Sequence, residues 1–152
     1  MSVLERNKAV VERYFGELNR GNLAVIDEVI DERYVAHDPS LPLEMREGID
    51  NLKQMIERSR TAFPDQRIEL DDVIAEGDLV ACRIKFFGHL AGEWDGLTYD
   101  GREISFTGMA MFRVEHGKII EAWYNYDHYG FMRQLGALPP ETRDPDKLNL
   151  YP

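Results

Sequence analysis

The chain has 152 residues, 43% of them apolar, and a formal net charge of -10. This length is enough for one domain with a sizeable core. The acidic charge argues against nucleic acids and anionic membranes as partners, because both require a basic surface. No apolar run approaches the ~20 residues of a membrane span. The first residues lack the apolar stretch of a signal peptide, so we expect none.

Cys82 is the single cysteine, so no disulfide can form within the chain. Its neighbours predict a buried strand, in which a free thiol behaves as a small apolar group. This cysteine usage is typical of a reducing compartment, and we expect the protein to be cytoplasmic. No histidine pair stands at ligand spacing and no phosphate-binding glycine motif occurs, so we expect neither a metal nor a cofactor.

The first half of the chain has the apolar periodicity of helices. Ser2 can cap the first helix and Gly21 can end it. The third helix should end before Pro64, because proline disfavours helical conformation in the preceding residue. Residues 34–44 are expected to form a short extended piece and a loop. The predicted helices cover residues 3–20, 23–30 and 48–63.

Beyond Pro64 the apolar period changes to two, which predicts strands in two hairpins. A last helix is expected over residues 128–138, within a single domain of residues 1–138, followed by a polar tail over 139–152. Helices followed by hairpins indicate an α+β fold, with helices on one face of an antiparallel sheet. Such a sheet can enclose a pocket for a small ligand. The predicted strands cover residues 67–76, 79–94, 104–115 and 118–127.

The register of the second hairpin decides which face carries Asp127. A two-residue turn at His116 and Gly117 pairs Glu115 with Lys118 and, further along, Phe106 with Asp127. Opposed side chains share a face, so this register predicts a polar and aromatic wall of a ligand pocket. The small residues that would leave room for the ligand are Gly108 and Ala110. The wall would also contain Glu121, Trp123 and Asn125.

The other face of the predicted hairpin would carry Met109, Met111, Tyr124 and Tyr126. Methionine and tyrosine are typical of subunit interfaces. A shift of one residue in register would exchange the two faces. Asp127 also stands just before a predicted helix, so it is either the N-cap of that helix or an acid/base in a pocket.

The motifs AFPD, EGD, GHLAGEW, GKIIEAW and DHYGFMRQLG occur in this order over about residues 5–138. With them the chain resembles the SnoaL-like polyketide cyclases of the NTF2-like and ketosteroid isomerase-like superfamily. The resemblance implies a cone-shaped α+β barrel around a pocket, and self-association of the sheet as a homodimer or tetramer. It also implies cofactor-free aldol ring closure of a polyketide ester, with Asp127 as general acid/base. Asn125 stands where these cyclases can have a histidine.

Ring closure of this kind removes a proton from carbon and later protonates an oxygen, and one carboxylate can do both. Contact with Phe106 and Trp123 would raise the pKa of Asp127 by desolvation. His37 is the second catalytic candidate. It could donate to a developing oxyanion, as could Asn125 and His89.

The remaining binding candidates are Tyr14, Trp94 and Glu121. Each candidate also has a purely structural interpretation. His37 and His89 could pack in a loop or end a strand, Tyr14 and Trp94 could belong to the core, and Glu121 could pair with a helix residue.

Three other functions remain open. Ketosteroid isomerase-like chemistry could use Tyr14 as the oxyanion donor. Epoxide hydrolysis would require an arginine between two carboxylates, and Arg113 lies on the opposite face in the expected register. The third is a non-catalytic protein that binds a small hydrophobic molecule, or a domain that only dimerises.

Overall fold

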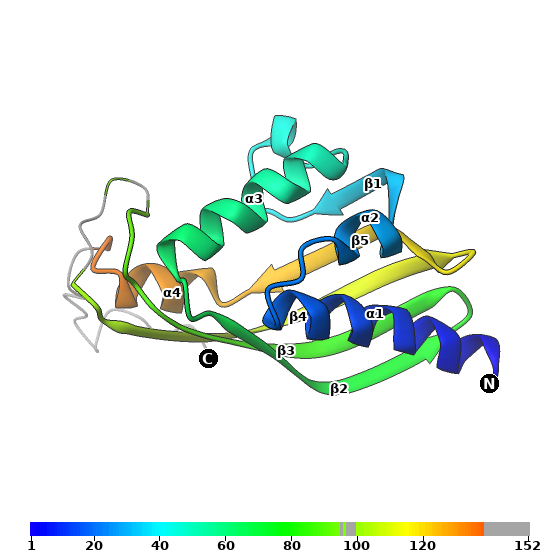
Figure 1. Ribbon diagram of the computed structural model, residues 1–152. Coiled ribbons are helices and arrows are strands. Elements are labelled where there is room, and N and C mark those ends of the chain that lie inside the picture. Colours follow the sequence, from blue (N-terminus) through cyan, green and yellow to red (C-terminus); the bar gives the residue numbers. More distant parts are fainter. Residues whose placement is uncertain (95, 97–99, 139–152) are drawn as a thin grey trace, which may run out of the picture.

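The computed structural model describes residues 1–94, 96 and 100–138 (Figure 1). The predicted tail at 139–152 lies outside the described residues. The helices are α1 (Val3–Asn19), α2 (Val25–Val29), the 3-10 turn η1 (Leu43–Met45), α3 (Ile49–Ala62) and α4 (His128–Gln134). The strands are β1 (Ile30–His37), β2 (Arg67–Glu76), β3 (Leu79–His89), β4 (Glu103–Glu115) and β5 (Lys118–Tyr126).

The strands form one curved sheet in the order β1-β5-β4-β3-β2. Helices α1, α2 and α3 lie over one face of it, which we call the inner face (Figure 1). The predicted α+β class, with N-terminal helices on a curved sheet, is confirmed. In the described part of the chain, no helix is long and apolar enough to cross a membrane.

The sheet is mixed, not antiparallel throughout as predicted. Strand β1 runs parallel to β5, with His37 beside Trp123. A parallel pair needs a long connection, and here α3 and three further strands separate the two partners. The segment predicted to be a short extended piece therefore belongs to a full strand, of which Tyr34 and Ala36 are buried.

Local signals set the helix ends as predicted. The Ser2 hydroxyl accepts from the Glu5 backbone at 3.1 Å, and the Glu5 carboxylate accepts from the Ser2 backbone at 2.7 Å. This reciprocal capping box satisfies two amides that have no partner within the helix. Phe63 leaves helical geometry ahead of Pro64, with φ -128 and ψ 77.

Strand β5 contains a β-bulge that the sequence did not reveal. The hairpin starts in the expected register, with Glu115 opposite Lys118. The pairing then shifts, so that Arg113 lies opposite Glu121 and not opposite Ile120. One extra residue in β5 moves all later side chains of that strand to the other face. The predicted register is therefore wrong from this point on.

The bulge exchanges the predicted faces of β5. Tyr124 and Tyr126 lie on the inner face, opposite Ala110 and Gly108. The face away from the helices, which we call the outer face, carries the β5 residues that had been predicted to line the pocket. These are Glu121, Trp123 and Asn125, opposite Arg113, Met111 and Met109.

Gly108 does not leave room for a ligand, because Tyr126 fills the space beside it. A Cβ atom at Gly108 would lie 2.6 Å from Cδ1 of Tyr126 and 3.0 Å from the Asn125 carbonyl oxygen. Gly108→Ala should therefore lower the free energy of unfolding by about 1–3 kcal/mol, as overpacking does. Urea denaturation measures this change.

Gly16→Ala is the matched control, because its Cβ would meet nothing closer than 3.4 Å. On a helix this change should raise the free energy of unfolding by about 0.5–1 kcal/mol. If Gly108→Ala proved as stable as the wild type, Tyr126 would not occupy the inner face beside it.

Candidate functional site

Three of the predicted site residues meet on the outer face. Nε2 of His37 lies 2.8 Å from Oε2 of Glu121, and the imidazole stacks on Trp123 at 5.1 Å between ring centroids. Arg113 donates to Oε1 of Glu121 at 3.1 Å and to Asp78 at 2.7 Å. The hydrogen bond from His37, and then that from Arg113, lowers the pKa of Glu121. The side chain of Glu121 thus pairs with His37 of β1 and Arg113 of β4, and not with a helix residue.

Arg113 does bridge two carboxylates, as the epoxide hydrolase alternative requires. The side chains of Arg113, Asp78 and Glu121 are 31%, 45% and 28% exposed, however, on the face opposite the helices. A water positioned there would exchange freely with solvent. The arrangement does not favour that function.

Asn125 and Asp127 are not on the inner face, contrary to the prediction. Asn125 is exposed on the outer face, opposite Met109. Asp127 is exposed at the end of β5, where its carboxylate accepts from the Gly130 backbone at 2.9 Å. This hydrogen bond makes Asp127 the N-cap of α4. A catalytic role for Asp127 remains a prediction.

His89 ends β3 in a histidine–aspartate pair. Its Nδ1 lies 2.5 Å from Oδ2 of Asp65, and its backbone N–H donates to Oδ1 at 2.8 Å. The hydrogen bond raises the pKa of His89, and the two hydrogen bonds from His89 lower the pKa of Asp65. Both side chains are about half exposed, at 54% and 52%. Asp65, the aspartate of the AFPD motif, thus binds both the backbone and the side chain of the last residue of β3.

This pair predicts a pH-dependent stability. The raised pKa of His89 means that this residue stabilises the folded protein fully below its ordinary pKa of 6.5. This contribution is lost as the pH rises through the raised value. Asp65 contributes above its ordinary pKa of 3.8 and loses this as the pH falls through its lowered value. His89→Gln should therefore lower the melting temperature more at about pH 5.5 than at about pH 9.

His116→Asn is the control for that experiment, since it removes an exposed turn histidine and leaves Asp65 and His89 in place. Its melting temperature should differ from that of the wild type equally at both pH values. Equal losses for His89→Gln at both values would mean that the pair adds no net stability in solution.

Trp94 and Phe106 are partly buried and pack against the smaller of two apolar clusters. Phe106 stacks on Phe86 with centroids 4.7 Å apart, and Trp94 lies 5.9 Å from Phe63. Arg58 also covers the Trp94 ring at 4.6 Å. Trp94 thus has the packing role that had been its alternative, and Phe106, which had been expected to line the pocket, packs in the same way.

Tyr14, from α1, is 3% exposed and belongs to the larger cluster beneath the helices. Three tyrosines that were not predicted for the site accompany it: Tyr34, Tyr124 and Tyr126. Burial raises the pKa of all four phenols above its ordinary value of 10.0. A hydrogen bond with Tyr124 partly offsets this effect for Tyr34. The phenols therefore stay protonated at neutral pH and can act as hydrogen-bond donors.

Asp38 is the one buried carboxylate among the described residues, with 6% of its surface exposed. Its Oδ1 accepts from the Ser40 backbone at 2.9 Å and from the Ser40 hydroxyl at 2.6 Å. Burial is the main cause of the raised pKa of Tyr34 and of Tyr126, and the negative charge of Asp38 raises the pKa of both phenols further. The alternation of Tyr34, Ala36 and Asp38 in a strand could have indicated this shared face.

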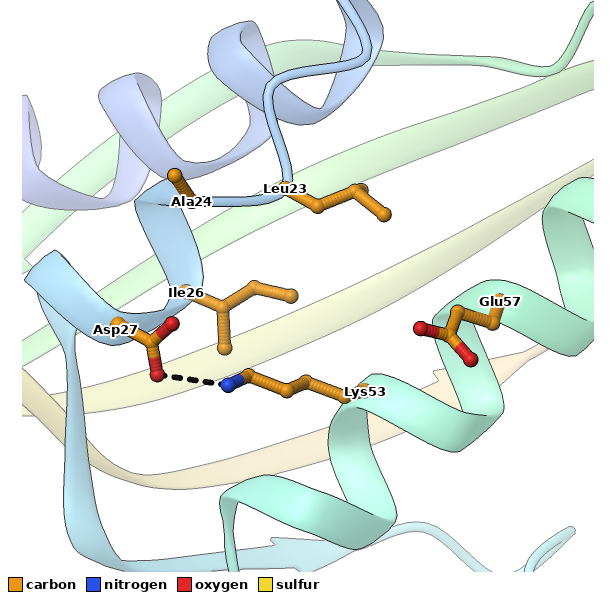
Figure 2. A pocket seen from close by; sticks show the side chains of 6 residues that line it. All are labelled: Leu23, Ala24, Ile26, Asp27, Lys53 and Glu57. Atoms are coloured by element: carbon orange, nitrogen blue, oxygen red, sulfur yellow. Dashed lines mark hydrogen bonds and ion pairs between the residues drawn. The ribbon is translucent and has the colours of Figure 1, made fainter.

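Two hollows border the helices. One of about 230 Å³ lies between α2 and α3 (Figure 2). The other, of about 620 Å³, lies between α1 and the edge strand β2. No residue predicted for the site lines either of them. Within the described ranges, no group of three or more histidine, cysteine, aspartate or glutamate side chains could hold a metal ion.

The chain matches one protein-family model and several solved structures. The family model of the SnoaL-like polyketide cyclases matches residues 8–135 of the sequence. IdmH from Streptomyces antibioticus, provisionally a polyketide cyclase, is 26% identical with a TM-score of 0.76, over 86% of this chain and 98% of its own. A search of the curated proteins finds no match.

Two further structures are similar over nearly their whole length. TsrD from Streptomyces laurentii is 27% identical with a TM-score of 0.78, over 91% of this chain and 99% of its own. AclR from Streptomyces galilaeus, provisionally a hydroxylase, is 25% identical with a TM-score of 0.80, over 90% of this chain and 99% of its own. The fold thus carries more than one named activity.

Proposed function

The chain belongs to the SnoaL-like polyketide cyclase family, and we propose that it catalyses cofactor-free, aldol-type ring closure of a small hydrophobic carbonyl substrate. The observation that carries the proposal is the buried Asp38 carboxylate, whose charge acts on the phenols of Tyr34 and Tyr126. A base and neutral hydrogen-bond donors in an apolar surrounding are what enolate chemistry requires.

In this proposal Asp38 is the general base. Ser40 occupies Oδ1 of Asp38 with two hydrogen bonds, which orients the carboxylate and leaves Oδ2 for the substrate proton. Removal of a proton from carbon between two carbonyls gives an enolate, whose oxygen accepts from the phenols of Tyr34 and Tyr126. The enolate carbon attacks the ketone, and Asp38 returns the proton to the resulting alkoxide. Proton and charge are thereby balanced without a cofactor.

Water exclusion strengthens each of these interactions. The inner face is apolar apart from the phenols and Asp38, and the effective dielectric constant there is low. Hydrogen bonds aimed at the developing oxyanion are therefore worth more than they would be at the surface. The outer pair of His37 and Glu121, at 44% and 28% exposure, lacks this advantage.

The test compares Asp38→Asn with Asp127→Asn on polycyclic keto-esters, steroid enones and epoxides. Asp38→Asn should still bind ligand, as measured by thermal shift, and lose turnover about 10²–10⁴-fold. Asp127→Asn should keep its turnover, because asparagine caps helices as well as aspartate does. Tyr126→Phe should lose less than Asp38→Asn.

The opposite outcome, with turnover kept by Asp38→Asn and lost by Asp127→Asn, would restore the role that the resemblance implies for Asp127. Turnover of a steroid enone alone would favour isomerase-like chemistry, in which Tyr14 was the expected donor. Binding without turnover by the wild type would favour a non-catalytic ligand-binding protein.

We also propose that the chain self-associates as a homodimer through the outer face. Four exposed apolar side chains support this: Ile74, Phe87, Met109 and Met111, at 68%, 36%, 56% and 39% exposure. Their strands pair so that all four lie on the outer face. A patch of this kind is typical of an interaction surface.

Sedimentation analysis tests this interface. The wild type should sediment at twice its chain mass of 17.6 kDa, and Met111→Glu should shift it to the monomer. Leu43→Glu is the matched control, because Leu43 is 76% exposed in η1, outside the sheet. A wild type that stays monomeric, or a Leu43→Glu variant that dissociates equally, would contradict the interface.

A further inference from the structure

A single ion pair crosses the hollow between α2 and α3. Nζ of Lys53 lies 2.8 Å from Oδ1 of Asp27. Figure 2 shows the two side chains extending toward each other from facing helices, with Leu23 and Ile26 pointing into the same space. Both charged groups are partly exposed, at 36% and 63%. Within the described residues, this is the only side-chain ion pair or hydrogen bond that joins the two helices.

The apolar lining of the hollow is continuous with the proposed site. Ile26 belongs to the larger apolar cluster, and Leu23 packs against it. The same cluster contains Tyr14, Tyr34 and Tyr124. Ile26 is 1% exposed, so the hollow reaches a side chain of the buried core.

We propose that this hollow is the entrance to the inner face, that it admits neutral apolar ligands, and that the Lys53–Asp27 pair is a latch across it. The inference rests on the proposed function only in placing the reaction on the inner face. A hollow of about 230 Å³ is smaller than most ligand sites. Its size therefore suits passage better than it suits residence.

The charges around the entrance favour neutral ligands over anions. Asp27 lines the hollow with Glu57, and Asp50 lies close enough for its charge to act on Lys53. Three carboxylates surround one ammonium, in a chain whose net charge is -10. An anion entering here would meet unfavourable potential, whereas an uncharged ester or ketone would not.

The latch opens easily because an exposed ion pair contributes little to stability. Helix α2 is five residues long, and its N-cap residue Ala24 provides no side-chain hydrogen bond. Its other ion pair, between Glu28 and Arg13, points to α1 and does not line the hollow. Each of the two acidic residues of α2 thus forms one ion pair, but only that of Asp27 spans the entrance, so Glu28 can serve as its control.

Cys82 supplies a direct readout of access to the inner face. It is the only cysteine in the chain, is 3% exposed and lies on β3 opposite Ala110, and burial raises the pKa of its thiol to about 12. An alkylating reagent can reach it only when the interior opens. The rate of its alkylation by iodoacetamide therefore follows the population of the open form, without any turnover.

Asp27→Asn and Lys53→Met should each raise this alkylation rate about two- to fivefold, as expected for loss of one exposed ion pair. Glu28→Gln, the control on the same helix, should leave the rate at the wild-type value. Unchanged rates in both latch variants, or an equal rise in Glu28→Gln, would overturn the latch.

The ligand class has its own test. The ratio of the iodoacetamide rate to the iodoacetate rate should be higher for the folded protein than for the same chain unfolded in urea. Glu57→Gln should reduce this ratio, and an unchanged ratio in the folded protein would overturn the charge preference. Alkylation of Cys82 needs no catalysis. A negative alkylation result would therefore not affect the proposed role of Asp38, and a negative turnover result for Asp38→Asn would not affect the proposed entrance.

Discussion

The extra residue of β5 at the bulge determines which side chains lie beneath the helices. Side chains alternate along a strand, so a shift of one residue moves Trp123 and Asn125 to the outer face and Tyr124 and Tyr126 to the inner face. The shift places the Tyr126 ring beside Gly108, where only a residue without a Cβ atom fits. The chemistry available to each face follows from this one local irregularity.

Desolvation then separates the two faces chemically. The phenols on the inner face are buried and stay neutral. Asp38, at the end of β1, is the one buried carboxylate of the described residues, and its charge acts on Tyr34 and Tyr126. On the outer face His37, Glu121 and Arg113 form a half-exposed network whose interactions solvent weakens. Acid/base chemistry on an apolar carbonyl compound is therefore better supported inside than outside. The hollow between α2 and α3 is lined in part by Ile26, which belongs to that interior.

Local sequence signals predicted much of this fold but not its site. The Ser2 cap, the helix end before Pro64 and the turn at His116 and Gly117 depend on neighbouring residues only, and all of them are present. The bulge could not be predicted because Ile119 and Ile120 are both apolar, so either register fits the pattern. The parallel partner of β1 is about 90 residues away, beyond the range of any local signal. Asp38 was missed because its segment was interpreted as a loop.

Interstrand nuclear Overhauser effects between β4 and β5 measure the register directly in solution. The structure requires contacts of the Met111 backbone with Trp123 and of the Met109 backbone with Asn125. Contacts of Ala110 with Trp123 and of Gly108 with Asn125 would instead show a hairpin without the bulge. In that case Asp127 would return to the inner face, and the assignment of the chemistry to Asp38 and the tyrosines would be wrong.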